Sequence, residues 1–187
     1  MAKLLRVNMT DLSVRFEDVP EKYALLGGRG LTSSIIYEEV PPLCHPLGPE
    51  NKLVIAPGIV SGTKAPTSGR TSFGGKSPLT GGIKESNAGG LSSQKIARLG
   101  IKAIIVEGQP KEKDRFYVLK VDKDGARLLP ADHLKGKGMY EVCDLLWKEH
   151  GEGVAIIGIG PAGEMRMASA GICVNAVSYT HLTLPTN

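Results

Sequence analysis

The stretch from Pro57 to Gly90 holds nine glycines in 34 residues, and this density constrains the fold more than any other feature of the chain. Glycine has no Cβ, so its backbone makes tight turns and lets another chain or a ligand approach closely. The glycines follow no three-residue period, which excludes a collagen-like helix. We therefore expect short strands and exposed turns here, with a surface whose chemistry comes largely from the backbone.

Composition narrows the class of protein further. Hydrophobic residues make up 41% and charged residues 22% of the 187, a mixture too apolar for a disordered chain. No run of about 18 apolar residues is present, so no membrane-spanning helix is encoded. The early charges near the first methionine are unlike a secretory signal. These features predict one domain, or one domain and part of another.

Charge and aromatic content bear on the binding partners. The net charge is +4, with basic and acidic residues interspersed, and aromatic residues account for only 5% of the chain. No basic stretch is interleaved with aromatic residues, so we expect no nucleic-acid partner. A mildly basic domain is still suited to a small anionic ligand.

The cysteines Cys44, Cys143 and Cys173 stand far apart and form no Cys-x-x-Cys pair. We therefore expect no zinc or iron–sulfur site within this chain. A sparse and odd number of cysteines favours a reducing compartment, so we expect a cytoplasmic protein. Cys143 falls on the apolar stripe of a predicted helix, which indicates a core residue.

Hydrophobic periodicity predicts an α+β fold. Alternating segments predict two β-hairpins, formed by residues 4–9 with 13–19 and by residues 116–122 with 126–129. Apolar residues at helical spacing predict three helices. The first begins after Gly30 and extends to Val40, the second covers Leu91–Leu99, and the third covers Met139–His150. Further strands are predicted at residues 52–56, 70–74, 83–86, 102–107, 154–159 and 168–174. The order of strands and helices occurs roughly twice, and hairpins mixed with crossovers favour α+β over a regular parallel sheet.

The segment Gly158–Gly163 matches the spacing G-x-G-x-x-G that dinucleotide-binding loops use. Such a loop needs a following helix, whose amides hold the pyrophosphate, within a βαβ unit. Here the residues from Glu164 to Arg166 lead toward another strand-like segment instead. We interpret the segment as a tight structural turn.

Two loops within the glycine-rich stretch are suited to an anion. In the first, Gly69 lets a ligand come close to the backbone, and Arg70 can fork onto a phosphate or carboxylate. In the second, Asn87-Ala88-Gly89-Gly90 precedes a predicted helix, and Asn87 is a candidate N-cap or part of the approach to the cap. Together the loops predict a ligand that bears phosphate. A stand-alone anion- or nucleotide-binding module without redox activity is one function that fits.

Five segments of the chain occur in an order and spacing that resemble a known family. They are Gly27–Leu31, Pro49–Leu53, Gly62–Arg70, Lys76–Gly81 and Ile157–Glu164. Between about Leu4 and Asn175 the chain resembles the N-terminal domain of aldehyde ferredoxin oxidoreductases, which are tungsten-pterin enzymes. Each segment is a weak signal alone, and the five in order are specific.

The resemblance implies both a fold and a site. The fold is α+β, with two related strand-rich halves and short helices that form a base for a bis-pterin cofactor of tungsten or molybdenum. Arg70 binds the phosphate region of the pterin, and the backbone carbonyl of Asn87 helps to hold the Mg²⁺ that bridges two phosphates. Gly89 contacts the cofactor, with Ala88 and Gly90 in the same loop. A fixed guanidinium suits a phosphate dianion, and magnesium prefers oxygen ligands.

The resemblance also implies the activity and the partners of a longer protein. That protein oxidises an aldehyde to a carboxylic acid and passes electrons through a [4Fe-4S] cluster to ferredoxin, and a homodimer is compatible with it. We expect the cluster ligands outside this chain and no catalysis by this chain alone. A relative that acts on another acid or acyl substrate is a further alternative.

The last ten residues, 178–187, fit no family pattern and carry no Asp, Glu, Lys or Arg. We expect them to be a non-native tail, such as a translated cloning or assembly scar. The tungstopterin-binding domain then occupies residues 1–177 and is incomplete at its C-terminal end.

Overall fold

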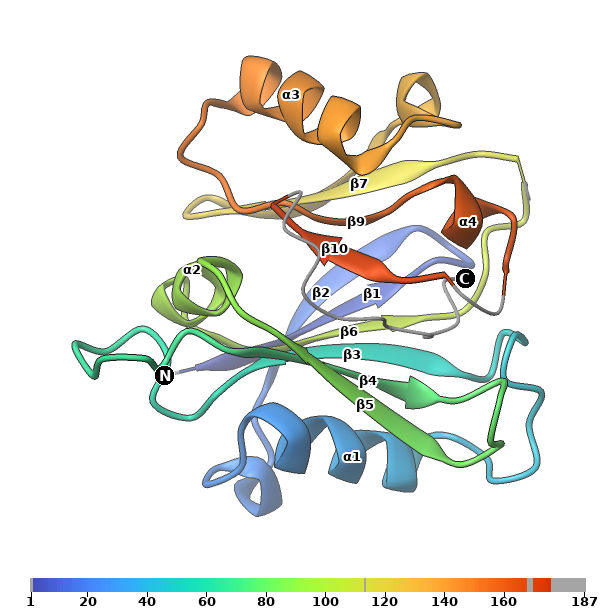
Figure 1. The fold of residues 1–187 in the computed structure, drawn as a ribbon. Coiled ribbons are helices and arrows are strands. Elements are labelled where there is room, and N and C mark those ends of the chain that lie inside the picture. The colour runs from blue at the N-terminus through green and yellow to red at the C-terminus, as the bar shows by residue number, and fades with distance from the viewer. Residues whose placement is uncertain (1, 113, 168–169, 176–187) are drawn as a thin grey trace.

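A six-stranded mixed sheet forms the centre of the computed structural model, which describes residues 2–112, 114–167 and 170–175 (Figure 1). In spatial order its strands are β2 (Ser13–Asp18), β1 (Lys3–Asn8), β6 (Ile101–Glu107), β3 (Lys52–Pro57), β4 (Thr71–Lys76) and β5 (Ile83–Ala88). β1 and β6 are parallel, and every other pair of neighbours is antiparallel. The expected non-native tail, residues 178–187, lies outside the described residues.

The elements of the first half recur in the second. The first half continues after its hairpin with the 3₁₀ turn η1 (Glu21–Tyr23), α1 (Gly28–Glu39), β3 and, later, α2 (Ser92–Arg98). The second half comprises β7 (Tyr117–Asp122), β8 (Gly125–Pro130), η2 (Asp132–Leu134), α3 (Met139–His150), β9 (Ile157–Ile159), α4 (Pro161–Glu164) and β10 (Ile172–Val174). Hairpin, 3₁₀ turn, helix and strand therefore follow one another twice, which confirms an α+β fold with two related halves.

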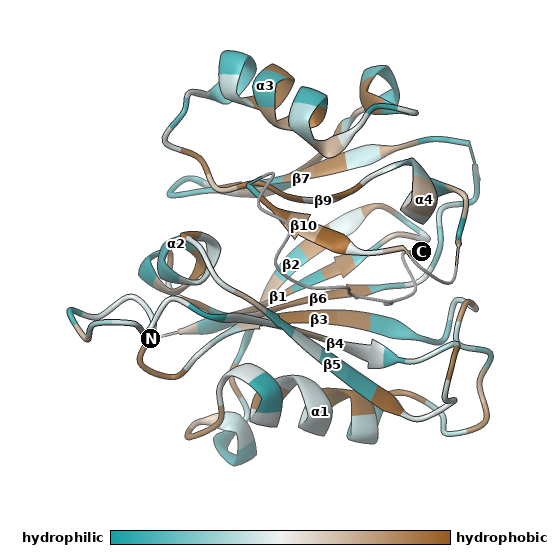
Figure 2. Cartoon of the chain, in the orientation of Figure 1, coloured by the Kyte–Doolittle hydropathy of each residue, from teal (hydrophilic) through white to brown (hydrophobic). Residues whose placement is uncertain are grey.

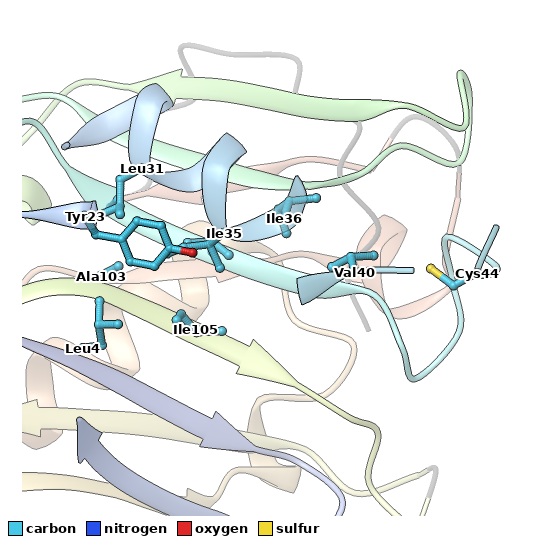
Figure 3. Packing of buried hydrophobic residues seen from close by; sticks show 11 residues of the cluster. Leu4, Tyr23, Leu31, Ile35, Ile36, Val40, Cys44, Ala103 and Ile105 are labelled. Carbon is cyan, nitrogen blue, oxygen red and sulfur yellow. The ribbon is translucent and has the colours of Figure 1, made fainter. Parts of the chain in front are cut away.

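The described elements stack in four layers, from α1 through the large sheet and the strands of the second half to α3 (Figure 1). Between α1 and the sheet lies a core that includes Leu31, Ile35 and Ile105, shown from close by in Figure 3. On the opposite face, Phe73 and other sheet residues pack against Ile172 of β10 and its neighbours. Since both faces are covered, β3 is hydrophobic for most of its length rather than alternating (Figure 2).

Most sequence-based expectations for the elements are confirmed, and several boundaries are corrected; the strand predicted at 168–174, for example, is described only at Ile172–Val174. The helix Met139–His150 and both hairpins form as predicted, and Cys143 is fully buried. α1 begins at Gly28 rather than after Gly30, because Gly27 supplies the extended residue before the first turn. β9 covers only the second half of the predicted strand 154–159. None of the helices in the described ranges is long and apolar enough to cross a membrane.

The segment Gly158–Gly163 is a structural turn, as predicted. The helix that follows β9 is only four residues long, and β10 returns antiparallel to β9, so no βαβ unit exists here. Glu164 closes the turn, because its carboxylate accepts hydrogen bonds from the backbone N–H of Gly136 at 2.9 and 3.1 Å. The turn therefore connects β9 to the loop before α3.

Arg6 is the centre of a cluster of five charged side chains that joins four strands and α1. Its guanidinium lies 2.8 Å from Glu39 Oε2 at the end of α1 and 3.0 Å from Glu107 Oε2 on β6. A third carboxylate, Glu17 on β2, lies 3.1 Å away. Lys52 Nζ on β3 lies 2.7 and 2.6 Å from the same oxygens of Glu39 and Glu107. The cluster thus holds the C-terminal end of α1 against the sheet.

The cluster predicts a pH dependence of stability. Burial alone would raise the pKa of Glu39, but hydrogen bonds from Arg6 and Lys52 outweigh it and hold this pKa below its ordinary 4.5. Such a carboxylate stabilises the fold above its ordinary pKa and loses that contribution as the pH falls through its folded-state value. We expect the free energy of unfolding to drop below pH 4.5, and Glu39→Gln to reduce that drop.

Urea denaturation on either side of pH 4.5 measures this effect. Glu50→Gln is the matched control, because Glu50 is exposed and forms no ion pair with any described residue. The control should keep the wild-type pH dependence. An unchanged pH dependence in Glu39→Gln would contradict the role given to the cluster.

Close packing of α1 on β4 depends on Gly74. A Cβ at this position would lie 2.6 Å from the Cβ of Thr32, a fully buried residue of α1. We expect Gly74→Ala to lower the free energy of unfolding by about 1–3 kcal/mol, because the helix must move away from the sheet. Gly153→Ala is the control, since no heavy atom lies within 4 Å of its added Cβ. Equal stability of the two variants in urea denaturation would refute this packing argument.

Candidate anion-binding site at the glycine-rich end of the sheet

The pairing of β4 with β5 brings the two predicted loops together. Arg70 is the last residue before β4, and Thr71 pairs with Ala88 while Ser72 pairs with Asn87. Gly89 and Gly90 follow directly, so they lie beside Arg70 at the same end of the sheet (Figure 1). The structure therefore brings together all the predicted site residues.

Of the two alternatives for Asn87, the N-cap is wrong, whereas a place on the approach to the cap agrees with the structure. Asn87 lies in β5, and the residue that precedes α2 in the capping position is Leu91, with no side-chain cap. The strand continues to Ala88 because its pairing with β4 satisfies the backbone there. The side chain of Asn87 instead donates from Nδ2 to Ser72 Oγ at 3.1 Å. This bond fixes Asn87 on the face of the sheet that α1 covers.

Glycine is required where the two loops touch. A Cβ at Gly69 would lie 3.1 Å from the carbonyl oxygen of Gly90, closer than ordinary contact. A Cβ at Gly89 would lie 4.0 Å from Arg70 Nη1, so the guanidinium lies directly over bare backbone. Gly90 has a φ of +102°, which other residues rarely adopt. The glycines thus leave bare backbone beside one cation.

Arg70 is held by its backbone and leaves its side chain available. Its N–H donates to Ser68 O at 3.0 Å, and its carbonyl accepts from the N–H of Gly58 at 3.1 Å. The side chain is exposed and forms no ion pair with any residue that the structure describes. An exposed guanidinium without a carboxylate partner can take a phosphate bidentately.

Gln94 of α2 anchors the loop before Arg70, a role that the sequence did not suggest. Its Oε1 accepts from the N–H of Gly62 at 2.7 Å, and its Nε2 donates to Ser68 Oγ at 3.0 Å. Ser61 adds a bond from its hydroxyl to the carbonyl of Ser68 at 2.7 Å. A single polar residue in a helix carries no pattern that identifies such a contact, so only the fold reveals it.

The chemistry of these residues fits an anion. The glycines leave bare backbone, Arg70 supplies charge, and Ser93 Oγ nearby is buried without a hydrogen-bond partner among the described residues. Within the same residues no group of three or more His, Cys, Asp or Glu could hold a metal ion. A magnesium ion here would therefore take oxygens from the backbone and from ligand phosphates, which is its usual preference. Arg70 and the carbonyl of Asn87 are the residues that would hold such a group.

Two other segments of the resemblance are structural. Asn51 Nδ2 donates to the carbonyls of Pro46 and Lys76 at 2.7 and 3.1 Å, and its Oδ1 accepts from the N–H of Lys76 at 3.0 Å. Lys76 in turn donates from its buried ammonium to the carbonyls of Pro42 and Cys44. Pro49–Leu53 and Lys76–Gly81 therefore fix the loop between α1 and β3, far from Arg70.

Comparison with known proteins identifies the family. The family model described as "Aldehyde ferredoxin oxidoreductase, N-terminal domain" matches residues 4–182. The chain is 40% identical over 173 residues to the tungsten-containing aldehyde ferredoxin oxidoreductase of Thermococcus kodakarensis, and 38% identical over 173 residues to that of Pyrococcus furiosus. The chain therefore belongs to the family of aldehyde ferredoxin oxidoreductase N-terminal domains. The matched region spans 91% of this chain but only 28% of the length of each of these curated relatives.

A solved structure shares the fold. It is the active site complex BamBC of benzoyl coenzyme A reductase in complex with 1,5-dienoyl-CoA, with a TM-score of 0.86 and 32% sequence identity. The match covers 92% of this chain and 26% of that one. The same fold thus occurs within proteins named for two different reactions.

Two neighbouring serines at the start of α2 should differ in how much their hydroxyl groups contribute to stability. Ser92 Oγ lies 2.7 Å from Thr71 Oγ1, and both residues are buried, whereas Ser93 Oγ has no described partner. We expect Ser92→Ala to lower the free energy of unfolding by about 1–3 kcal/mol, because it leaves Thr71 unsatisfied, and Ser93→Ala to cost less. Urea denaturation of both variants provides the measurement. A larger loss in Ser93→Ala would show that its hydroxyl has a structural partner.

Proposed function

We propose that this chain is the cofactor-binding part of a longer oxidoreductase that oxidises aldehydes to carboxylic acids and passes electrons to ferredoxin. The observation that carries the proposal is the exposed guanidinium of Arg70, which has no ion-pair partner among the described residues and lies by the bare backbone of Gly89. Supporting it is the identity of 37–40% to proteins named as tungsten-containing aldehyde ferredoxin oxidoreductases. The resident group is then a bis-pterin of tungsten or molybdenum together with Mg²⁺.

The residues of this chain bind and orient in that proposal. Arg70 would hold a pterin phosphate through its guanidinium, and the carbonyl of Asn87 would offer an oxygen to magnesium. Ala88, Gly89 and Gly90 complete the loop, where missing side chains let the phosphate reach the backbone. When bound, the metal of the cofactor supplies the two-electron oxidation of the substrate, while the protein orients the group.

The remaining parts of the proposed enzyme lie outside this chain. The [4Fe-4S] cluster that passes electrons singly to ferredoxin, and the pocket for the aldehyde, belong to the larger part of the polypeptide. We assign no catalytic residue to residues 1–187, and we place the full protein in the cytoplasm, where free thiols persist. A stand-alone anion- or nucleotide-binding module is disfavoured, because the family match covers nearly the whole chain.

A different substrate is the second candidate. The likeness to a benzoyl coenzyme A reductase complex, at a TM-score of 0.86, favours an acyl thioester as the alternative substrate class. Both reactions use the same kind of N-terminal frame, so the choice depends on the rest of the protein. Assays of the full-length protein with an aldehyde and with an aromatic acyl-CoA, with ferredoxin as the redox partner, separate the two.

Arg70→Ala should weaken cofactor retention in the full-length protein. Loss of one charge-assisted contact to a phosphate corresponds to about 2 kcal/mol, or roughly thirtyfold in affinity. The measurement is tungsten or molybdenum by elemental analysis and pterin by fluorescence, per polypeptide. Arg127→Ala is the matched control, because Arg127 lies on β8 and is exposed without a described ion pair.

Two results would count against this proposal in different ways. Wild-type protein that contains neither metal nor pterin after expression with tungstate or molybdate would remove the enzyme assignment. Full cofactor loading in Arg70→Ala would remove only the role given to that arginine. Loss in Arg70→Ala together with full loading in Arg127→Ala supports both statements.

A further inference from the structure

Arg29, in the first turn of α1, is held by a buried carboxylate. Its Nε donates to Glu85 Oε2 at 2.8 Å, across 56 residues of sequence. The arginine side chain is 76% exposed, whereas the glutamate side chain is only 7% exposed. The bond uses Nε alone, so no described residue takes up the two terminal nitrogens of the guanidinium.

Stability does not account for this arrangement. An ion pair with one exposed partner contributes about 0–1 kcal/mol, whereas burial of a carboxylate is costly. The second oxygen, Glu85 Oε1, adds to this cost, because it is buried and accepts no hydrogen bond from any residue in the described ranges. A buried carboxylate that accepts a hydrogen bond only from Nε of an exposed guanidinium fixes the direction in which the two terminal nitrogens point.

The first turn of α1 adjoins the site of Arg70. A Cβ at Gly28 would lie 3.4 Å from Ser72 Oγ and 3.8 Å from the Cα of Gly58. Ser72 accepts the hydrogen bond from Asn87, and the N–H of Gly58 donates to the carbonyl of Arg70. The start of α1 therefore lies next to Ser72 and Gly58, two residues that hydrogen-bond to residues of the candidate site.

Charge and geometry favour an anion on this side as well. Glu85 and Asn87 are two residues apart on β5, so their side chains share one face of the sheet. No side chain caps α1, and its first turn contains no acidic residue. The positive end of the helix dipole and the guanidinium of Arg29 thus add to one another.

We propose that Arg29, oriented by Glu85, is a second anion-binding arginine that takes a phosphate of the ligand bound beside Arg70. This inference rests on the proposed function for the identity of the ligand as a pterin phosphate. The contact made by Arg29 requires only that the ligand carries a phosphate ester or a diphosphate. Glu85 is a positioning residue in this arrangement, since it acts through Arg29.

The test uses the full-length protein that contains this chain. The variants are Arg29→Gln, Glu85→Gln, the double variant, and Arg127→Gln as the matched control for loss of an exposed arginine. The first measurement is the rate at which the purified protein loses pterin and metal in buffer with inorganic phosphate. The second is the affinity of the cofactor-free protein for inorganic pyrophosphate, by titration calorimetry. Thermal denaturation of each cofactor-free variant reports on folding.

We expect Arg29→Gln to lose the cofactor about tenfold faster and to bind pyrophosphate about tenfold more weakly. Its melting temperature should fall, because the buried carboxylate of Glu85 loses its charged partner, and the double variant should recover this loss. Glu85→Gln should show a smaller effect in the same direction, because the fork is no longer fixed. The double variant should be no worse than Arg29→Gln, since two residues that act through one contact are not additive. Arg127→Gln should match the wild type.

The outcomes separate this inference from the proposed function. Wild-type rates of cofactor loss and wild-type pyrophosphate affinity in Arg29→Gln overturn the inference and leave the proposed function standing. Additive effects in the double variant overturn the positioning role of Glu85. A wild-type protein without pterin or metal overturns the proposed function, and the pyrophosphate titration then decides the inference by itself.

Discussion

The contact between α1 and β4 sets the position of everything at the glycine-rich end of the sheet. Thr32 occupies the space that a side chain at position 74 would need, so the helix lies directly on the strand. The other end of α1 is held by Glu39 in the cluster of charges around Arg6. With both ends fixed, the first turn of α1 meets Ser72 and Glu85 at one place. A bulkier strand would move Arg29 away from the site.

Local sequence patterns predicted the elements whose partners are local. The stripe of α3 and the turn at Asp124-Gly125 are encoded within about a dozen residues, so periodicity and turn chemistry suffice. The place of β6 between β1 and β3 was not predictable in this way. Strand pairing over about a hundred residues depends on which faces are buried together, and no short pattern records that.

The residues of the candidate site likewise fall into those that the sequence suggested and those that only the fold revealed. Arg70 and the loop from Asn87 to Gly90 were suggested by residue type and by the resemblance, and β4–β5 pairing brings them together. The error over Asn87 arose because an asparagine before a helix favours a cap, while strand pairing proved stronger here. Gln94 and Glu85 went unnoticed because their roles depend on contacts between distant segments.

The order of strands in the large sheet has a consequence for synthesis of the chain. β6 is inserted between β1 and β3, yet it is the last of the six strands to leave the ribosome. Until residue 107 has emerged, the β1–β2 hairpin and the β3–β4–β5 unit each expose an unpaired edge with buried-type side chains. Such edges invite pairing with other chains. The nascent polypeptide therefore passes through a period with two unpaired sheet edges, and this period ends when β6 pairs with both β1 and β3.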